Sequence, residues 1–364
     1  MTTAPPTGDL TAGAERTGPG PRDDTGPARR HRHRHRHRLL ILLTATALLL
    51  VVAVLSVMIG ARAIAPGTVW DALLHFDDSD EHVMVRELRV PRTVIGLVTG
   101  AALGLSGALI QAFTRNPLAD PGILGVNAGA SLAVTFAVAV LGYTAAGQFI
   151  WFALGGAFGL TVLVYALGSI GADRGTPVKL TLAGVAFTAV CGGFTSAMAL
   201  KSTTTFDVMR FWGVGSIGGR SLDILPVAMP LIGAGLLLGL LSAGSLNALA
   251  LGDDIARSLG TRLAVTRVAV ILAVTLLAGT AVAIAGPISF VGLMVPHIVR
   301  WFVGPDQRWI LPVTVIVAPA FLLVADIIGR VVLPSGELRV GLVTALVGAP
   351  VLVALVRRRK VSTL

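Results

Sequence analysis

Charged residues and aromatic rings are scarce in this sequence. Only 13% of its 364 residues are Asp, Glu, Lys or Arg and 5% are aromatic, whereas 54% are hydrophobic and 43 are glycine. A water-soluble domain of this length would need more charge to cover its surface, so the composition excludes that class. It is typical of a polytopic membrane protein.

The sequence also has only one cysteine, Cys191, and three lysines, Lys179, Lys201 and Lys360. A single cysteine excludes an internal disulfide and a cysteine metal cluster. None of the lysines follows a glycine, so the phosphate-binding loop of a self-contained ATPase of that type is absent. We find no nucleophile paired with a base, and therefore expect no enzyme activity and no cofactor bound by this chain.

Ionisable side chains within the apolar runs are few, which bears on the cargo and its driving force. Asp326 lies four residues before Arg330, a spacing that permits either a local structural pair or a proton relay. His297 lies beside Arg300 without a second ligand, so we read it as structural or interfacial and predict no metal site. Transport of a bare metal ion would need hard or imidazole ligands, so a chelated cargo fits better.

Positive charge is concentrated at the two ends of the chain, whose formal net charge is +10. Residues 1–38 are rich in Pro, Gly, Thr and Arg, which predicts a disordered basic tail. Its His-Arg repeat at 31–38 could hold a metal, but the arginines repel cations and favour anionic lipid. Residues 357–364 form a second basic tail. This distribution fits membrane topology and gives no reason to expect nucleic-acid binding.

Between the tails, residues 39–356 read as one all-α membrane domain of about ten spans. An even number of spans puts both termini on one side, and the two basic tails mark that side as cytoplasmic. A short surface helix is expected at 68–75, in the first outer loop. The predicted spans are 39–60, 92–113, 122–141, 148–170, 178–200, 221–243, 263–285, 287–302, 309–329 and 338–356.

A polar segment at 245–262 separates two long apolar blocks and falls on the cytoplasmic side. Gly252 is expected to break one helical turn, Asp253 and Asp254 to open a second, and Gly260 to end it. Leucine and isoleucine give each short helix an apolar face. Such a segment can be a tight loop packed on its own spans or a docking surface for a soluble partner.

Three stretches resemble the FecCD family of BtuC-like permeases, which belong to importers of ferric siderophores, haem and cobalamin. They are residues 89–125, with Arg-Val-Pro-Arg-Thr and Asn-Pro-Leu-Ala-Asp-Pro-Gly-Ile-Leu-Gly, residues 249–260, and residues 286–300, with Gly-Pro-Ile-Ser-Phe-Val-Gly. The resemblance implies a BtuC-like fold and a permease subunit that translocates ferric siderophores across the cytoplasmic membrane. Cobalamin or haem is the alternative cargo.

The resemblance also implies partners. These are a second permease, either a copy or a paralogue, two cytoplasmic ATPase subunits that hold ATP and Mg, and an extracytoplasmic substrate-binding protein. It makes the polar segment the ATPase-coupling loop. The coupling residues are Leu251, Gly252, Asp253, Asp254, Ala256, Arg257, Leu259 and Gly260.

Arg89, Arg92 and Arg330 lie at span ends on the outer face. We expect the helix to start no earlier than Pro91 and the guanidinium groups of Arg89 and Arg92 to project at the mouth. Simple snorkelling to lipid phosphates would explain this placement. The resemblance instead implies that the three arginines dock acidic residues of the binding protein. The sequence departs from the family at Arg339, where a proline is usual, which adds positive charge there.

The fifth predicted span carries a stripe of small and hydroxyl-bearing residues at helical spacing. Such a stripe can line a wide, wet path or form a tight seam between helices, and the resemblance favours the path. An ion-coupled secondary transporter, the alternative from another class, would need broken helices and paired intramembrane charges, which are scarce. The residues of the stripe are Thr181, Gly184, Thr188, Gly192, Thr195 and Ser196.

Overall fold

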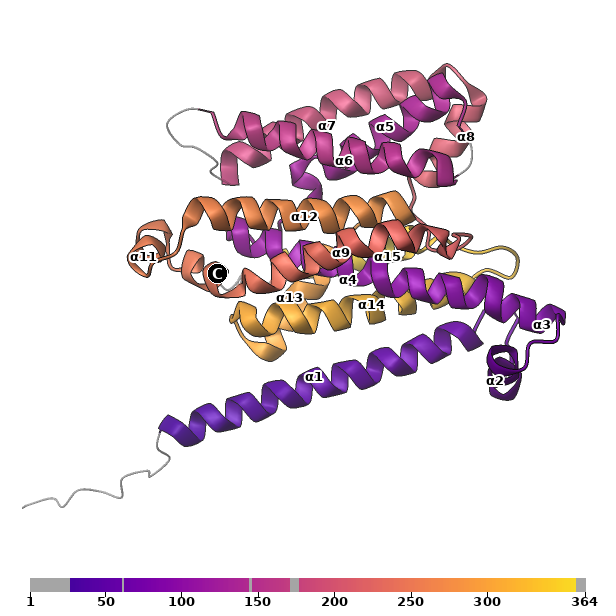
Figure 1. The fold of residues 1–364 in the computed structure, drawn as a ribbon, viewed down its shortest axis with the longest axis horizontal. Helices are drawn as coiled ribbons and strands as arrows, with labels where there is room; N and C mark the ends of the chain where they lie inside the picture. Colours follow the sequence, from indigo (N-terminus) through magenta and orange to yellow (C-terminus); the bar gives the residue numbers. More distant parts are fainter. Residues whose placement is uncertain (1–26, 61, 144–145, 171–176, 358–364) are drawn as a thin grey trace, which may run out of the picture.

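The computed structural model describes residues 27–60, 62–143, 146–170 and 177–357, and every regular element in those ranges is helical (Figure 1). Among these described residues, seven helices are long and apolar enough to cross a membrane, and three apolar helices are shorter. They match the ten predicted spans in order, which confirms the all-α polytopic fold. These helices are α1 (Pro27–Met58), α4 (Val90–Thr114), α5 (Val126–Leu141), α6 (Ala146–Gly168), α7 (Pro177–Leu200), α9 (Leu225–Leu241), α12 (Leu263–Ala285), α13 (Val291–Val303), α14 (Gln307–Val331) and α15 (Val340–Arg357).

Short helices cluster at the two ends of this bundle. The predicted surface helix is confirmed as α2, whereas α8 stands in a segment expected to be a loop. Ser202 starts α8 by accepting a hydrogen bond from the backbone N–H of Thr205. The short elements are α2 (Pro66–Leu74), α3 (Asp80–Val83), the π-helix η1 (Met84–Arg89), the 3₁₀ turns η2 (Pro121–Leu124) and η3 (Leu222–Ile224), α8 (Thr203–Trp212), α10 (Ala243–Ala250) and α11 (Asp253–Ser258).

Helix α4 lies at the centre of the bundle and packs on α9, α12, α13 and α14. In its most apolar 18-residue stretch, 78% of the residues are buried, against 17% in the corresponding stretch of α1. Helix α1 runs along α14 at one edge of the bundle (Figure 1). Helices α5, α6 and α7 form a second group, joined to the first because α12 packs on both α5 and α6. The α11 end and the α3 end of the bundle lie at opposite sides of the view.

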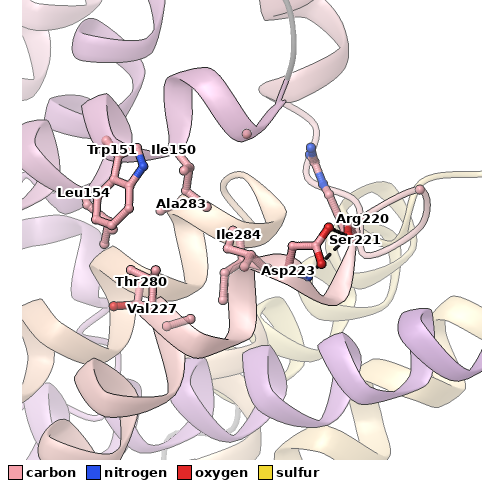
Figure 2. A pocket seen from close by; sticks show the side chains of 14 residues that line it. Ile150, Trp151, Leu154, Arg220, Ser221, Asp223, Val227, Thr280, Ala283 and Ile284 are labelled. Atoms are coloured by element: carbon pink, nitrogen blue, oxygen red, sulfur yellow. Dashed lines mark hydrogen bonds between the residues drawn. The ribbon is translucent and has the colours of Figure 1, made fainter.

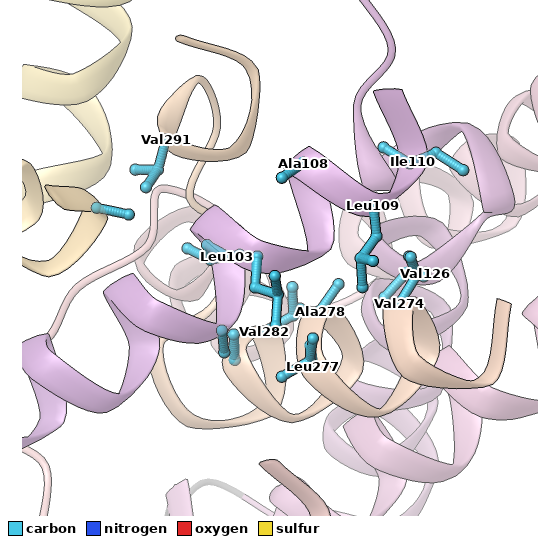
Figure 3. Close-up of a cluster of buried hydrophobic side chains, with 14 of the residues drawn as sticks. Leu103, Ala108, Leu109, Ile110, Val126, Val274, Leu277, Ala278, Val282 and Val291 are labelled. Carbon is cyan, nitrogen blue, oxygen red and sulfur yellow. The ribbon is translucent and has the colours of Figure 1, made fainter. Parts of the chain in front are cut away.

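Small residues let the central helices approach closely. A Cβ atom at Gly104 would lie 2.3 Å from the Cβ of Ala318, and one at Gly107 would lie 1.9 Å from the carbonyl oxygen of Gly292. The face of α4 that carries these glycines is therefore a packing surface against α14 and α13. On another side of α4, Leu103 and Leu109 lie among the buried side chains of α12 (Figure 3).

Several predicted helix starts differ from the observed ones, and two of these differences have a clear local cause. Helix α1 already begins at Pro27, so residues 27–38 are helical although they were expected to be disordered; arginine is a good helix former, and extending an existing helix avoids the cost of nucleation. The eighth span begins at Val291, four residues after the predicted start at 287, because Phe290 takes a left-handed φ of 70°. The remaining parts of the two predicted tails, 1–26 and 358–364, lie outside the described residues.

Candidate functional site

The polar segment forms the predicted pair of short helices. Helix α10 ends at Ala250, Gly252 adopts a φ of 107°, α11 runs from Asp253 to Ser258, and Gly260 has a φ of 81°. Both glycines occupy conformations that other residues rarely adopt. The chain therefore makes two sharp bends at fixed places, and α11 is held as a separate helix at one end of the bundle (Figure 1).

The apolar residues of this segment divide into a buried set and an exposed set. Leu249 and Ala256 pack into the core at 4% and 0% exposure. Leu251, Ile255 and Leu259 are exposed at 58%, 50% and 63%, and they recur every four residues. A soluble partner could bury this exposed apolar row, whereas a loop packed only on its own spans would hide it.

The Asp253 carboxylate fixes α11 to two transmembrane helices. Its Oδ1 accepts a hydrogen bond from Nη2 of Arg115 at 2.5 Å, and its Oδ2 accepts one from Nη2 of Arg267 at 2.6 Å. Arg115 caps the end of α4, and Arg267 lies on α12. Asp254 pairs only within α11, with Arg257, and its side chain is 97% exposed. Of these two carboxylates, Asp253 links α11 to α4 and α12, whereas Asp254 does not.

Helix α10 is attached to α14 by a separate polar cluster. Nδ2 of Asn247 donates to Oδ1 of Asp306 at 2.7 Å, and Oδ1 of Asn247 accepts from the backbone N–H of Gln307 at 2.9 Å. Arg38 of α1 lies 3.5 Å from the same Asp306 carboxylate. These side chains and Arg115 were missed from the sequence, since their partners are distant along the chain.

The three outer arginines do lie together, but their geometry differs from the prediction. Arg89 and Arg330 are 6% and 2% exposed, so neither guanidinium projects into solvent. Nη1 of Arg89 donates to the carbonyl oxygens of Val57 and Met58 at 2.9 and 2.6 Å. Nη1 of Arg330 likewise donates to backbone carbonyls at the end of α1. Both arginines thus hold α1 against the bundle.

The third arginine, Arg92, belongs to a network centred on Asp326. Nη2 of Arg92 lies 2.8 Å from Oδ1 of Asp326, and Nη2 of Arg330 lies 2.8 Å from Oδ2. The Asp326 side chain is 1% exposed, and Arg92 also reaches Glu337 at 2.6 Å. The predicted Asp326–Arg330 pair is therefore present, with a second arginine added. A carboxylate shared by two guanidinium groups in this way serves as a structural anchor.

The helix also does not start at Pro91 as predicted. The π-helical turn η1 runs directly into α4, so the chain is helical on both sides of the proline. Pro91 takes the second position of α4, where a missing N–H costs little, and the wider π turn precedes it. This continuous helix turns Arg89 toward α1 and Arg92 toward α14. A cavity of about 380 Å³ lies among these arginines, Arg62 and Glu337.

The predicted stripe of small and hydroxyl-bearing residues on α7 is divided between a buried surface and an exposed one. Gly184 lies in a tight seam, where an added Cβ would be 1.7 Å from the carbonyl oxygen of Ile123 in η2. Thr188, Gly192 and Ser196 are exposed and follow one another at four-residue spacing. Thr181 and Thr195 are partly buried between these surfaces. The described residues contain no group of three His, Cys, Asp or Glu side chains that could hold a metal ion.

Comparison with known proteins assigns the chain to a family. Residues 48–358 match the FecCD transport family. This chain belongs to that family. The chain is 50% identical to the ferric enterobactin transport system permease protein FepD of Escherichia coli K12, and the match covers 84% of this chain and 91% of that protein. It is 39% identical to the probable siderophore transport system permease protein YfiZ of Bacillus subtilis, over 83% of this chain and 91% of that one.

The FecCD assignment extends to the three-dimensional structure. The chain superposes with a TM-score of 0.76 on a solved chain described as an inward-facing conformation of "a putative metal-chelate type ABC transporter", at 28% identity, and the match covers 88% of this chain and 99% of the other. The compared FecCD proteins are thus matched over nearly their whole length.

Proposed function

We propose that this FecCD protein is the permease subunit of an ATP-driven importer of ferric siderophores. Similar proteins named for ferric enterobactin, siderophore and iron(3+)-hydroxamate transport support this cargo. A relative named for hemin is 34% identical, and the haem and cobalamin alternatives are less favoured than siderophores. Asp326 is committed to two arginines, which argues against a proton-coupled carrier.

The observation that best supports ATP-driven transport is the exposed apolar row of α11, clamped through Asp253 to α4 and α12. We infer that each permease presents this helix to one of two cytoplasmic ATPase subunits, which hold ATP and Mg. The row would be buried in a cleft of the partner, and the Asp253 clamp would convey its movement to the spans. We infer that the α11 end and both termini face the cytoplasm.

The exposed side of α7 supports pairing with a second permease, either a copy or a paralogue. Leu182 and Phe194 are exposed at 66% and 62% beside Thr188, Gly192 and Ser196. We propose that this mixed face borders the central path of the dimer, with the small and hydroxyl-bearing residues toward the cargo. The His-Arg repeat at 31–38, in the first part of α1, would lie on anionic lipid at the cytoplasmic surface.

We further propose that the extracytoplasmic binding protein docks over the cavity beside Arg92. Arg89 and Arg330 are committed to backbone carbonyls, whereas Arg92 has one exposed partner, Glu337, whose side chain is 42% exposed. An acidic side chain of the binding protein could take the place of Glu337 at the Arg92 guanidinium. Docking would then exchange one ion pair for another without uncovering the buried network.

The test is uptake by vesicles that contain the purified permease, its ATPase subunits and the binding protein. A radiolabelled ferric siderophore should enter when ATP is supplied and should continue to enter after a protonophore collapses the proton gradient. Haem and cobalamin, offered separately, should not enter. Uptake driven by a pH gradient without ATP would refute the ATP-driven function, and uptake of haem or cobalamin alone would refute the cargo.

A further inference from the structure

A second cavity, distinct from the arginine cluster, opens at the α3 end between α6, η3, α9 and α12 (Figure 2). Its volume is about 430 Å³. Arg220, Ser221 and Asp223 lie at one end of the cavity, and Leu154, Val227 and Ile284 line apolar walls. A cavity with a charged end and apolar walls suits an amphipathic ligand.

Two polar atoms at the cavity have no hydrogen-bond partner among the described residues. One is Nε of Arg220, at the charged end, and the other is Oγ1 of Thr280, whose residue is 1% exposed. Both atoms are covered by their surroundings, and a buried donor left without a partner costs about 1–3 kcal/mol, so a shift of either side chain toward a ligand that offers acceptors is favourable. Thr280 lies about 8 Å from the end of α12 at Ala285, by helical rise, so the two donors act at different depths.

The charge at the rim favours an anion. Burial lowers the pKa of Arg220, and the positive charge of Arg339 lowers it further. The one carboxylate of the rim, Asp223, accepts a hydrogen bond from the Ser221 hydroxyl at 2.5 Å. Arg220 is the arginine that lines the cavity, and an anion bound there would offset both the repulsion from nearby Arg339 and the loss of hydration.

The opposite wall of the cavity carries an exposed tryptophan. Trp151 of α6 lines it and remains 58% exposed, one turn from the start of that helix. Tryptophan is enriched where a membrane protein crosses the head-group layer, since its ring is apolar and its N–H is polar. Trp151 and Arg220 therefore mark head-group depth, and Leu154 lies one turn deeper on α6.

We propose that this cavity binds an anionic phospholipid. The phosphate meets Arg220, an ester carbonyl of the glycerol backbone accepts a hydrogen bond from Thr280, and the acyl chains leave past Trp151 and Leu154 into the bilayer. The proposal requires only that the chain spans a membrane and is independent of the cargo and of ATP. A free phosphate ion shares the head-group chemistry but would gain nothing from the apolar walls.

The experiment counts lipids bound to the purified, delipidated full chain by native mass spectrometry as phosphatidylglycerol is titrated. Arg220→Gln should weaken binding of one phosphatidylglycerol about tenfold, which corresponds to the loss of about 1.4 kcal/mol. Thr280→Val, which removes only the hydroxyl donor, should weaken it less. Val227→Trp fills the cavity while keeping Arg220 and should also remove the bound lipid.

Arg210→Gln is the matched control, because α8, which carries Arg210, lies at the same end of the bundle, and Arg210 is exposed and pairs with Asp207. It should bind phosphatidylglycerol as the unmodified chain does, and each variant is checked for an unchanged unfolding temperature. Equal retention of phosphatidylglycerol by the unmodified chain, Arg220→Gln and Val227→Trp would overturn the proposal. Displacement by inorganic phosphate at equal concentration, or equal binding of phosphatidylcholine, would also overturn it.

Discussion

Asp253→Asn should uncouple α11 from the membrane helices while leaving the exposed apolar row in place. The substitution keeps the shape of the side chain and removes the charge that holds Arg115 and Arg267. Asp254→Asn, one residue further along, is the matched control because Asp254 pairs only within α11. A difference between the two variants therefore reports the clamp and not the charge of the segment.

The size of the effect follows from the exposure of the two ion pairs. The Asp253 side chain is 33% exposed, between the fully buried and fully exposed cases. Hydrogen bonds to charged groups contribute about 1.5–3 kcal/mol and exposed ion pairs about 0.2–1 kcal/mol, so we take about 1 kcal/mol for each pair. Losing both would cost about 2 kcal/mol, which is roughly a 30-fold change in the population of the clamped arrangement.

The assay measures ATP-driven uptake and the ATPase rate in the same vesicles. Asp253→Asn should lower uptake about 10–30-fold with the ATPase subunit still bound, whereas Asp254→Asn should change it about twofold or less. Asp253→Glu keeps the charge and should recover part of the uptake. If Asp253→Asn transports as well as Asp254→Asn, the clamp does not transmit movement and the reasoning is wrong.

Three further predictions concern the packing and the arginine network. Asp326→Asn should destabilise the protein by about 3–5 kcal/mol, because it leaves Arg92 and Arg330 buried without their shared carboxylate. The control, Asp207→Asn, breaks an exposed ion pair and should cost less than about 1 kcal/mol. Thermal unfolding in detergent measures both variants, and equal unfolding temperatures would contradict the role of Asp326 as an anchor. Gly107→Val should abolish folded protein, because the valine side chain would overlap the backbone at Gly292. The control, Gly159→Val, should fold, because nothing lies within 4 Å of the added Cβ. Size-exclusion profiles compare the two variants, and a monodisperse Gly107→Val would refute the close packing. Glu337→Gln should strengthen docking of the binding protein, because it frees the Arg92 guanidinium from its ion pair with Glu337. The dissociation constant of the binding protein, measured across a salt series, tests this. Weaker docking would count against the exchange of ion pairs.

The sequence by itself determined the elements whose causes are local. Apolar runs of membrane-spanning length predicted ten spans, and the structure contains a helix for each. Gly252, Asp253 and Gly260 fixed the two short helices of the polar segment, since left-handed glycines and an acidic first turn depend on only a few neighbouring residues. The family motifs were likewise readable from the linear sequence.

Only the tertiary structure decided where the charged side chains point. Arg92 and Asp326 are 234 residues apart in the chain and meet because α4 packs along α14, so no local pattern could show that the guanidinium is paired and not free. The same holds for Asp253, whose partners lie on α4 and α12, and for the leucines of the polar segment, of which Leu249 is buried and Leu259 exposed. The free energy of a charge or an apolar side chain at a helix end depends on what faces it, and that is set by helix packing across the whole chain.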